Sequence, residues 1–135
     1  MFYLSEYLES HHETYYARLR GISRENDWTG WVEFFLTAIT AQARTNTARV
    51  RGILDLYAEM KLRISDLIRS QHSLKVLDAL FDRPVFQAGE FMRAGVPKPT
   101  ASRFLTALRN AGILQVLRPA RGSQSAVMAF RELLN

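Results

Sequence analysis

The amino-acid sequence predicts a mainly α-helical fold that ends in one small β-hairpin. Three observations support this prediction. Apolar residues recur at steps of three and four over most of residues 28–70, which is the spacing of one helix face. Proline and glycine divide residues 71–112 into shorter helical segments. Two apolar stretches then flank a polar, glycine-containing turn near the end of the chain.

The composition is that of an ordinary globular protein. The 135 residues suffice for one average domain or for two small ones that share a core. With 47% hydrophobic and 23% charged residues, the chain lies outside the range of disordered sequences. The absence of cysteine excludes disulfides and thiolate metal sites. The lack of cysteine also fits a reducing cytoplasm, and no apolar run reaches the roughly 20 residues of a membrane helix. We therefore expect a cytoplasmic protein that does not enter a membrane.

The N-terminal part of the chain, residues 1–70, is expected to form a helical platform. Residues 3–24 predict one or two short helices, with a break around Ser10–His12 and an end near Gly21–Arg24. Asn26–Asp27 then offers an N-cap for a long helix that runs without proline to Ser70. The polar segment ARTNTAR, residues 43–49, is the one expected place for a break in that helix. Two tryptophans, at positions 28 and 31, are interpreted as core anchors.

Residues 70–95 repeat the helical pattern in two shorter segments. Ser73 is the expected cap of the first helix, and Pro84 ends it. Its expected apolar face comprises Leu74, Val76, Leu77, Leu80 and Phe81. Residues 88–94 predict a two-turn helix that ends at Gly95 and turns Phe91 and Met92 inward.

The remaining residues predict a helix and a hairpin. Pro99 suits the start of a helix that continues to about Ala111 and closes at Gly112. ILQVLRP (113–119) and AVMAF (126–130) read as strands on either side of the turn at residues 120–125, and RELLN as a fragment of helix. This order of elements predicts a winged helix-turn-helix over residues 71–135, which shares its core with the platform over residues 1–70.

The positive charge of the chain is concentrated at its C-terminal end. Residues 97–135 hold six Lys or Arg side chains and one acid, a net charge of +5, whereas residues 1–96 are balanced. The third helix of a helix-turn-helix enters the major groove of DNA, and the wing clamps the adjacent backbone. The candidate DNA-binding residues are Lys98, Thr100, Ser102, Arg103, Thr106, Arg109, Arg118 and Arg121.

Ala101, Leu105 and Leu108 are expected to be buried on the other side of the third helix. Lys98 and Arg103 are the best candidates for contacts with bases, because arginine can pair with guanine through two hydrogen bonds. The leading hypothesis is therefore binding to double-stranded DNA in a transcription-regulator-like role. A homodimer is expected, since paired half-sites multiply the few base contacts of one module. Residues 50–69 are long enough for a dimer seam but too short to establish a heptad repeat.

Other chemistry has little support in the sequence. His11 and His12 are adjacent and point about 100° apart on a helix, so they cannot chelate one ion together, and His72 is isolated. No glycine-rich phosphate loop and no local nucleophile motif occurs. We expect no catalytic residue, no metal site and no cofactor in this chain.

Three segments resemble the C-terminal portion of the Fic family, the AMP-transferring enzymes named for filamentation induced by cyclic AMP. YLSEYLESHHETYYARL is similar to the helix after the Fic catalytic helix, and NDWTGWVEFFLTAITAQA is the most specific match. The third segment runs from Leu74 to Asn135, with TASRFLTALRNAGIL and FRELLN, and resembles an appended winged helix. Together the three segments cover nearly the whole chain.

The family signature, His-x-Phe-x-Asp/Glu-Gly-Asn-x-x-Arg, is absent, because none of the three histidines is followed by it. The resemblance therefore implies a remnant or a fragment without the active site, whose N-terminal aromatic residues would contact a missing Fic catalytic core. It also leaves an alternative to DNA binding open. The chain would then be a protein–protein, regulatory or dimerisation module of an AMP-transferase.

Overall fold

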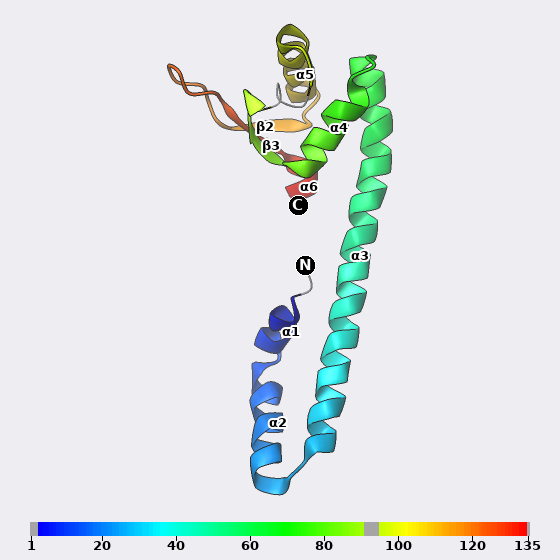
Figure 1. Ribbon diagram of the computed structural model, residues 1–135, viewed down its shortest axis with the longest axis vertical. Coiled ribbons are helices and arrows are strands. Elements are labelled where there is room, and N and C mark those ends of the chain that lie inside the picture. The colour runs from blue at the N-terminus through cyan, green and yellow to red at the C-terminus, as the bar shows by residue number, and fades with distance from the viewer. Residues whose placement is uncertain (1–2, 91–94, 135) are drawn as a thin grey trace. The chain divides into compact units, whose positions relative to one another are not determined.

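The computed structural model describes residues 3–90 and 95–134 (Figure 1). The chain is mainly helical, with one three-stranded antiparallel sheet near its C-terminal end. This arrangement confirms the predicted fold class at that level of detail. The chain forms two compact units, Met1–Gly52 and Ile53–Asn135. Sequence analysis expected a division near residue 70 instead. The difference arises because the last turns of the long helix α3 contribute Met60, Ile64 and Ile68 to the core of the second unit.

The N-terminal unit consists of α1 (Leu4–Ser10), α2 (His12–Glu25) and the first part of α3 (Trp28–Ile68). The expected break near residues 10–12 is confirmed at His11. Helix α2 ends at Glu25, and its C-cap residue Asn26 adopts a left-handed conformation with φ 56°. Asp27 caps α3 as predicted, because the backbone N–H of Gly30 donates to its Oδ1 at 2.9 Å.

Helix α3 is continuous, so the break expected at residues 43–49 does not occur. The threonines of that segment satisfy their hydroxyl groups within the helix. Thr45 donates to the carbonyl oxygen of Ala41 at 3.2 Å, and Thr47 to that of Ala43 at 2.8 Å. Such back-bonding lets polar residues remain in a helix without an outside partner.

The core of the N-terminal unit is small and aromatic. Helices α1 and α2 have no buried residues of their own. Phe34 of α3 is buried and packs against Tyr7 of α1, Tyr15 of α2 and Trp31. Trp31 is thus a core anchor as expected. Trp28 is not, since 58% of its surface is exposed.

In the C-terminal unit, α4 (Ser73–Asp82) follows α3 and buries Val76, Leu77 and Leu80 as predicted. Two expectations about α4 are wrong. Ser73 lies inside the helix and His72 occupies the cap position without a side-chain hydrogen bond. Leu74 is 49% exposed, because it lies on the side of the helix that faces away from the core.

The sheet has one strand more than predicted. Strand β1 (Val85–Gln87) pairs with the central strand β3 (Val127–Phe130), which also pairs with β2 (Leu114–Arg118). Both pairs are antiparallel, and Phe86 lies opposite Met128. The predicted hairpin β2–β3 is therefore confirmed. The two-turn helix expected at residues 88–94 lies largely outside the described residues.

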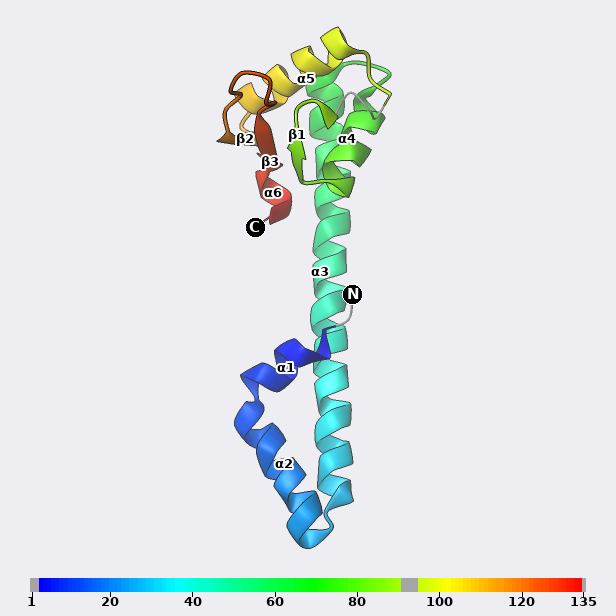
Figure 2. The same ribbon diagram turned by 60° about the vertical axis from the view of Figure 1, so that its left-hand side comes forward.

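Helix α5 (Lys98–Asn110) precedes the sheet's second strand, and the short α6 (Arg131–Leu134) follows its third (Figure 2). A continuous core joins the end of α3, α4, the sheet and α5. Arg63 of α3 donates to both carboxylate oxygens of Glu132 in α6, at 2.9 and 3.1 Å. Within the described residues, no helix is both long and apolar enough to cross a membrane.

Candidate nucleic-acid interface

Helix α5 has well-defined ends. Pro97 precedes its first residue, and Pro99 lies in the first turn, where the missing N–H removes no helical hydrogen bond. At the other end Gly112 has φ +76°, a conformation that glycine adopts without steric cost. The N–H of Ile113 then donates to the carbonyl oxygen of Leu108 at 3.0 Å.

The buried side of α5 faces the core of the C-terminal unit. Ala101, Leu105 and Leu108 are buried as predicted, together with Val96 and Ile113 just outside the helix. Phe104 is buried as well, with 2% of its surface exposed, although sequence analysis did not include it among the core residues. The sequence did contain a signal for this burial. Phe104 lies three residues after Ala101 and four before Leu108, so it shares their face of the helix.

The opposite side of α5 is exposed and polar. Of the predicted residues on this helix, Thr100 is half-buried and the rest are exposed; these are Lys98, Ser102, Arg103, Thr106 and Arg109. Steps of four, four and three place Lys98, Ser102, Thr106 and Arg109 in one row along the helix. We call these four residues the α5 row.

Two members of this surface have internal partners. The hydroxyl of Thr106 donates to the carbonyl oxygen of Ser102 at 3.0 Å, so its proton is used within the helix. Arg103, on the flank of the α5 row, holds its guanidinium carbon 5.8 Å from the centre of the Phe104 ring. A cation over an aromatic ring is weakly attracted to it and keeps its hydrogen-bond donors available.

The two other predicted residues lie in the hairpin. Arg118 ends β2 and Arg121 begins the tight turn, and both are exposed. Backbone hydrogen bonds in both directions join Arg121 and Gln124, at 3.2 and 2.9 Å, and Gly122 between them has φ +56°. The turn therefore has a defined conformation, and its glycine has the left-handed geometry that such turns require.

The charges of these residues are uncompensated within the protein. Among residues 3–90 and 95–134, no ion pair involves Lys98, Arg103, Arg109, Arg118 or Arg121. Several arginines elsewhere are paired; Arg49 contacts Glu6, and Arg83 contacts Asp82 and Glu90. No hydrogen bond or ion pair of the described part joins the α5 row to the hairpin.

The clear electrostatic perturbations lie away from this surface. Hydrogen bonding to Arg49, followed by its charge, lowers the pKa of the Glu6 carboxyl. The Tyr57 hydroxyl donates to Asp78 Oδ1 at 2.7 Å, and this bond raises the pKa of Tyr57. Both are contacts between side chains of different helices. Among the described residues, no group of three or more His, Asp or Glu could hold a metal ion.

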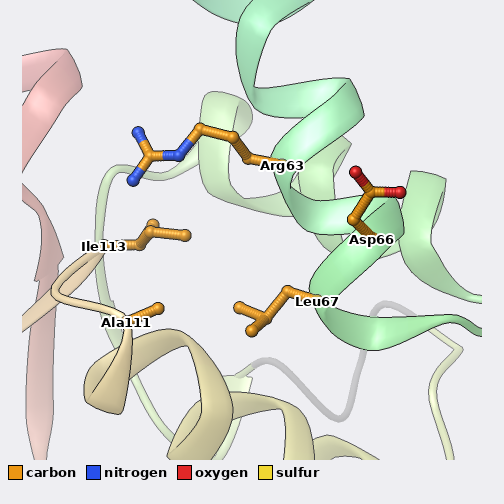
Figure 3. Close-up of a pocket in the computed structure, with 5 residues that line it drawn as sticks. All are labelled: Arg63, Asp66, Leu67, Ala111 and Ile113. Atoms are coloured by element: carbon orange, nitrogen blue, oxygen red, sulfur yellow. The ribbon is translucent and has the colours of Figure 1, made fainter.

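An open depression in the C-terminal unit was not expected from the sequence. It is lined by Arg63, Asp66 and Leu67 of α3 and by Ala111 and Ile113 beyond α5 (Figure 3). The guanidinium of Arg63 is already bound to Glu132 and lies 3.6 Å from Glu59. The remaining walls are largely apolar, so the depression offers little polar chemistry for a ligand.

A comparison of the chain with protein-family models finds no family that matches it. The likeness to Fic proteins therefore rests on the three sequence segments alone.

Proposed function

We propose that this chain is a DNA-binding module of winged-helix type, in which α5 enters the major groove and the β2–β3 hairpin serves as the wing. The order α4, α5, hairpin supports this proposal, together with the antiparallel sheet that holds the hairpin. In such modules the N-terminal part of the recognition helix, the third helix of the domain, approaches the base edges.

The observation that carries the proposal is the set of unpaired cations on α5 and the hairpin. A surface that needs arginine only for solubility commonly carries acids among its bases. The described residues from 95 to 134 contain one acid, Glu132, and it is bound to Arg63. The cations therefore remain available for phosphate groups, whose neutralisation releases counterions from DNA.

We propose different roles for these residues. Arg103 and Lys98, near the start of α5, are proposed to reach base edges. Ser102 is proposed to bond a phosphate oxygen, and Arg109, in the last turn, to meet the backbone. Thr106 has committed its proton to Ser102, so it would act as an acceptor or through its methyl group. Thr100 is half-buried, so it offers less surface to DNA than the exposed candidate residues of α5.

Fluorescence anisotropy with a labelled random-sequence duplex, at low and moderate salt, tests the proposal. The triple variant Lys98→Ala/Arg103→Ala/Arg121→Ala should bind more weakly than the parent. On a random-sequence duplex, where the three cations meet phosphates rather than matched bases, the plot of log affinity against log salt should be shallower by up to about 3, roughly one unit for each lost phosphate contact.

The matched control removes three exposed cations elsewhere, by Arg20→Ala/Arg24→Ala/Lys61→Ala. No ion pair of the described part involves these three side chains. Both variants lose the same charge, so a general effect of net charge would weaken them equally. Equal losses of DNA affinity in the two variants would contradict a defined binding site on α5 and the hairpin. If the parent fails to bind even at low salt, DNA binding is rejected, and the basic surface should be tested against acidic proteins.

A further inference from the structure

In the N-terminal unit, helix α3 has two apolar sides, although folding of that unit requires only one. The first side is covered, since Phe34 and Ala38 are buried and Trp31 is half-buried. The second side is open to solvent. Val32 is 49% exposed, Leu36 57% and Val50 55%. Large apolar side chains that gather on one exposed face mark an interaction surface more often than isolated ones do.

The open side has the spacing of a helix–helix seam. Its members follow one another at steps of four, three, four, three and four residues, and we call them the open heptad face: Val32, Leu36, Ile39, Ala43, Asn46 and Val50. Alternation of three and four keeps a seam in contact with a second helix along its whole length. A loop or an irregular protein surface would not require this regularity.

We infer that the open heptad face binds the same face of a second copy of this chain, with the two α3 helices antiparallel. The charges beside the face favour this partner and this direction. Glu33, near the start of α3, is the one acid between residues 28 and 52, and Arg44 and Arg51 lie further along. Helical geometry places these three charges on the same flank of the face.

Antiparallel pairing turns this asymmetry into charge complementarity. With Val32 of one copy against Val50 of the second, Glu33 of the first copy lies beside Arg51 of the second. By symmetry, Arg51 of the first copy lies beside Glu33 of the second. In a parallel pair the same flank of the two helices lies on opposite sides of the seam, so Glu33 would not meet Arg51. No ion pair among the described residues occupies Glu33, Arg44 or Arg51, so all three are available to a partner.

Asn46, the fifth of the six positions of the open heptad face, is polar. It is half-buried, and its Oδ1 accepts a hydrogen bond from Gln42 Nε2 of the same helix at 3.3 Å. With Val32 against Val50 of the second copy, Asn46 lies opposite Leu36, close to the end of the seam, and its amide oxygen can keep the hydrogen bond from Gln42.

Sedimentation velocity of the full chain over a range of concentrations tests the inference. The parent should sediment with twice the mass of the 15.5 kDa chain. Leu36→Glu/Val50→Glu should raise the dissociation constant more than about 100-fold, because each copy would bury two unpaired charges. Ala48→Glu is the control and should leave the dimer intact, because Ala48 is exposed on the opposite side of α3.

A charge exchange tests the antiparallel direction independently of the apolar residues. Glu33→Arg and Arg51→Glu should each weaken the dimer, since each variant places like charges side by side. An equimolar mixture of the two variants should recover dimers, because every flank contact then joins opposite charges. Both positions are exposed, so neither change disturbs the core.

Three results would overturn the inference. The parent could remain a monomer at all concentrations, which would exclude pairing with a second copy. Alternatively, Leu36→Glu/Val50→Glu could dimerise as well as Ala48→Glu does. Failure of the mixed variants to associate would exclude the antiparallel pairing. DNA binding is tested separately, because no residue of the open heptad face belongs to α5 or the hairpin.

Discussion

Phe104 has a large part in the stability of the C-terminal unit. It is one of the largest fully enclosed side chains, with 2% of its surface exposed, and it fills the space between α5 and the rest of the core. Phe104→Ala should lower the free energy of unfolding by about 3–5 kcal/mol, through lost burial and the cavity left behind. Urea denaturation monitored by circular dichroism measures this change.

Leu117→Ala is the matched control for this prediction. Leu117 is an apolar residue of β2 with 54% of its surface exposed. Its truncation should change the free energy of unfolding by less than about 0.5 kcal/mol. Equal effects of the two substitutions would mean that Phe104 is not enclosed by the core.

Two glycines of α3 should differ in how their substitution by alanine changes the stability of the protein. A Cβ at Gly30 would collide with the Asp27 carboxylate and the Arg18 guanidinium, whereas a Cβ at Gly52 would meet nothing within 4 Å. Gly52→Ala should stabilise the protein by about 0.5–1 kcal/mol, because alanine is the better helix former. At Gly30 the same gain should be cancelled or exceeded, because displacement of the cap formed by Asp27 costs about 1 kcal/mol. Thermal unfolding of the two variants compares them, and an equal stabilisation by both would contradict the cap geometry.

At the scale of single residues, the sequence predicted burial well where helical periodicity was regular. Ala101, Leu105 and Leu108 are buried as expected, since successive turns of the helix point them the same way. The prediction of burial failed for Trp28 and Leu74, which are apolar yet exposed. Composition identifies a residue that can be buried, but only the position of the neighbouring elements decides whether it is.

Helices α1 and α3 are joined by one bidentate ion pair. Arg49 donates to both carboxylate oxygens of Glu6, at 3.1 and 2.9 Å, and Gln42 Nε2 lies 3.5 Å from the same carboxylate. Hydrogen bonding to Arg49 lowers the pKa of Glu6. A carboxyl whose pKa is lower in the folded than in the unfolded protein stabilises the folded state at pH values above its unfolded pKa. This contribution is lost as the pH falls through the pKa of the folded state.

Glu6→Gln should therefore lower the Tm slightly at pH 7, since the exposed pair is screened by solvent. The difference from the parent should disappear at a pH well below about 4, the ordinary range for Glu. Glu9→Gln is the control, because Glu9 is exposed on the same helix and no ion pair of the described part involves it. Circular dichroism melts at several pH values measure both. A difference that grows in acid would have the wrong sign for this pair.

At the scale of elements, helices were easier to predict than strands. The longer helices have a capping signal or a long apolar period that can be read locally. Strand β1 has neither. It is a short segment directly after Pro84, and it exists because β3, much later in the chain, supplies its hydrogen-bond partners. The error at residues 43–49 had the opposite cause, since polar threonines suggested a break but bond within the helix.

At the scale of the whole molecule, charge and burial are distributed differently between the two compact units. The predicted concentration of positive charge in residues 97–135 coincides with α5 and the hairpin, both in the C-terminal unit. That much of the candidate site was readable from the sequence, because net charge depends on composition alone. Which cations remain unpaired was not readable, since Arg63 and Glu132 lie far apart in the sequence and meet only in the fold.

The two units should also differ in local stability. In the N-terminal unit, α1 and α2 bury no residue completely, whereas α4 and α5 of the C-terminal unit bury Val76, Leu80 and Leu108, each fully enclosed. Local opening costs less free energy where fewer apolar contacts must be broken. Amide hydrogen exchange measured by mass spectrometry should therefore be faster in α1 and α2 than in α4 and α5.

Phe34→Ala separates this explanation from simple fraying of the chain end. The substitution removes the side chain on which Tyr7 and Tyr15 pack, so exchange in α1 and α2 should accelerate further. Exchange in α4 and α5 should stay within error of the parent, because their core contains no buried residue before Met60. Equal acceleration in both units would mean that they unfold as one cooperative body. In that event the continuous helix α3 transmits the loss of the N-terminal core to the C-terminal one.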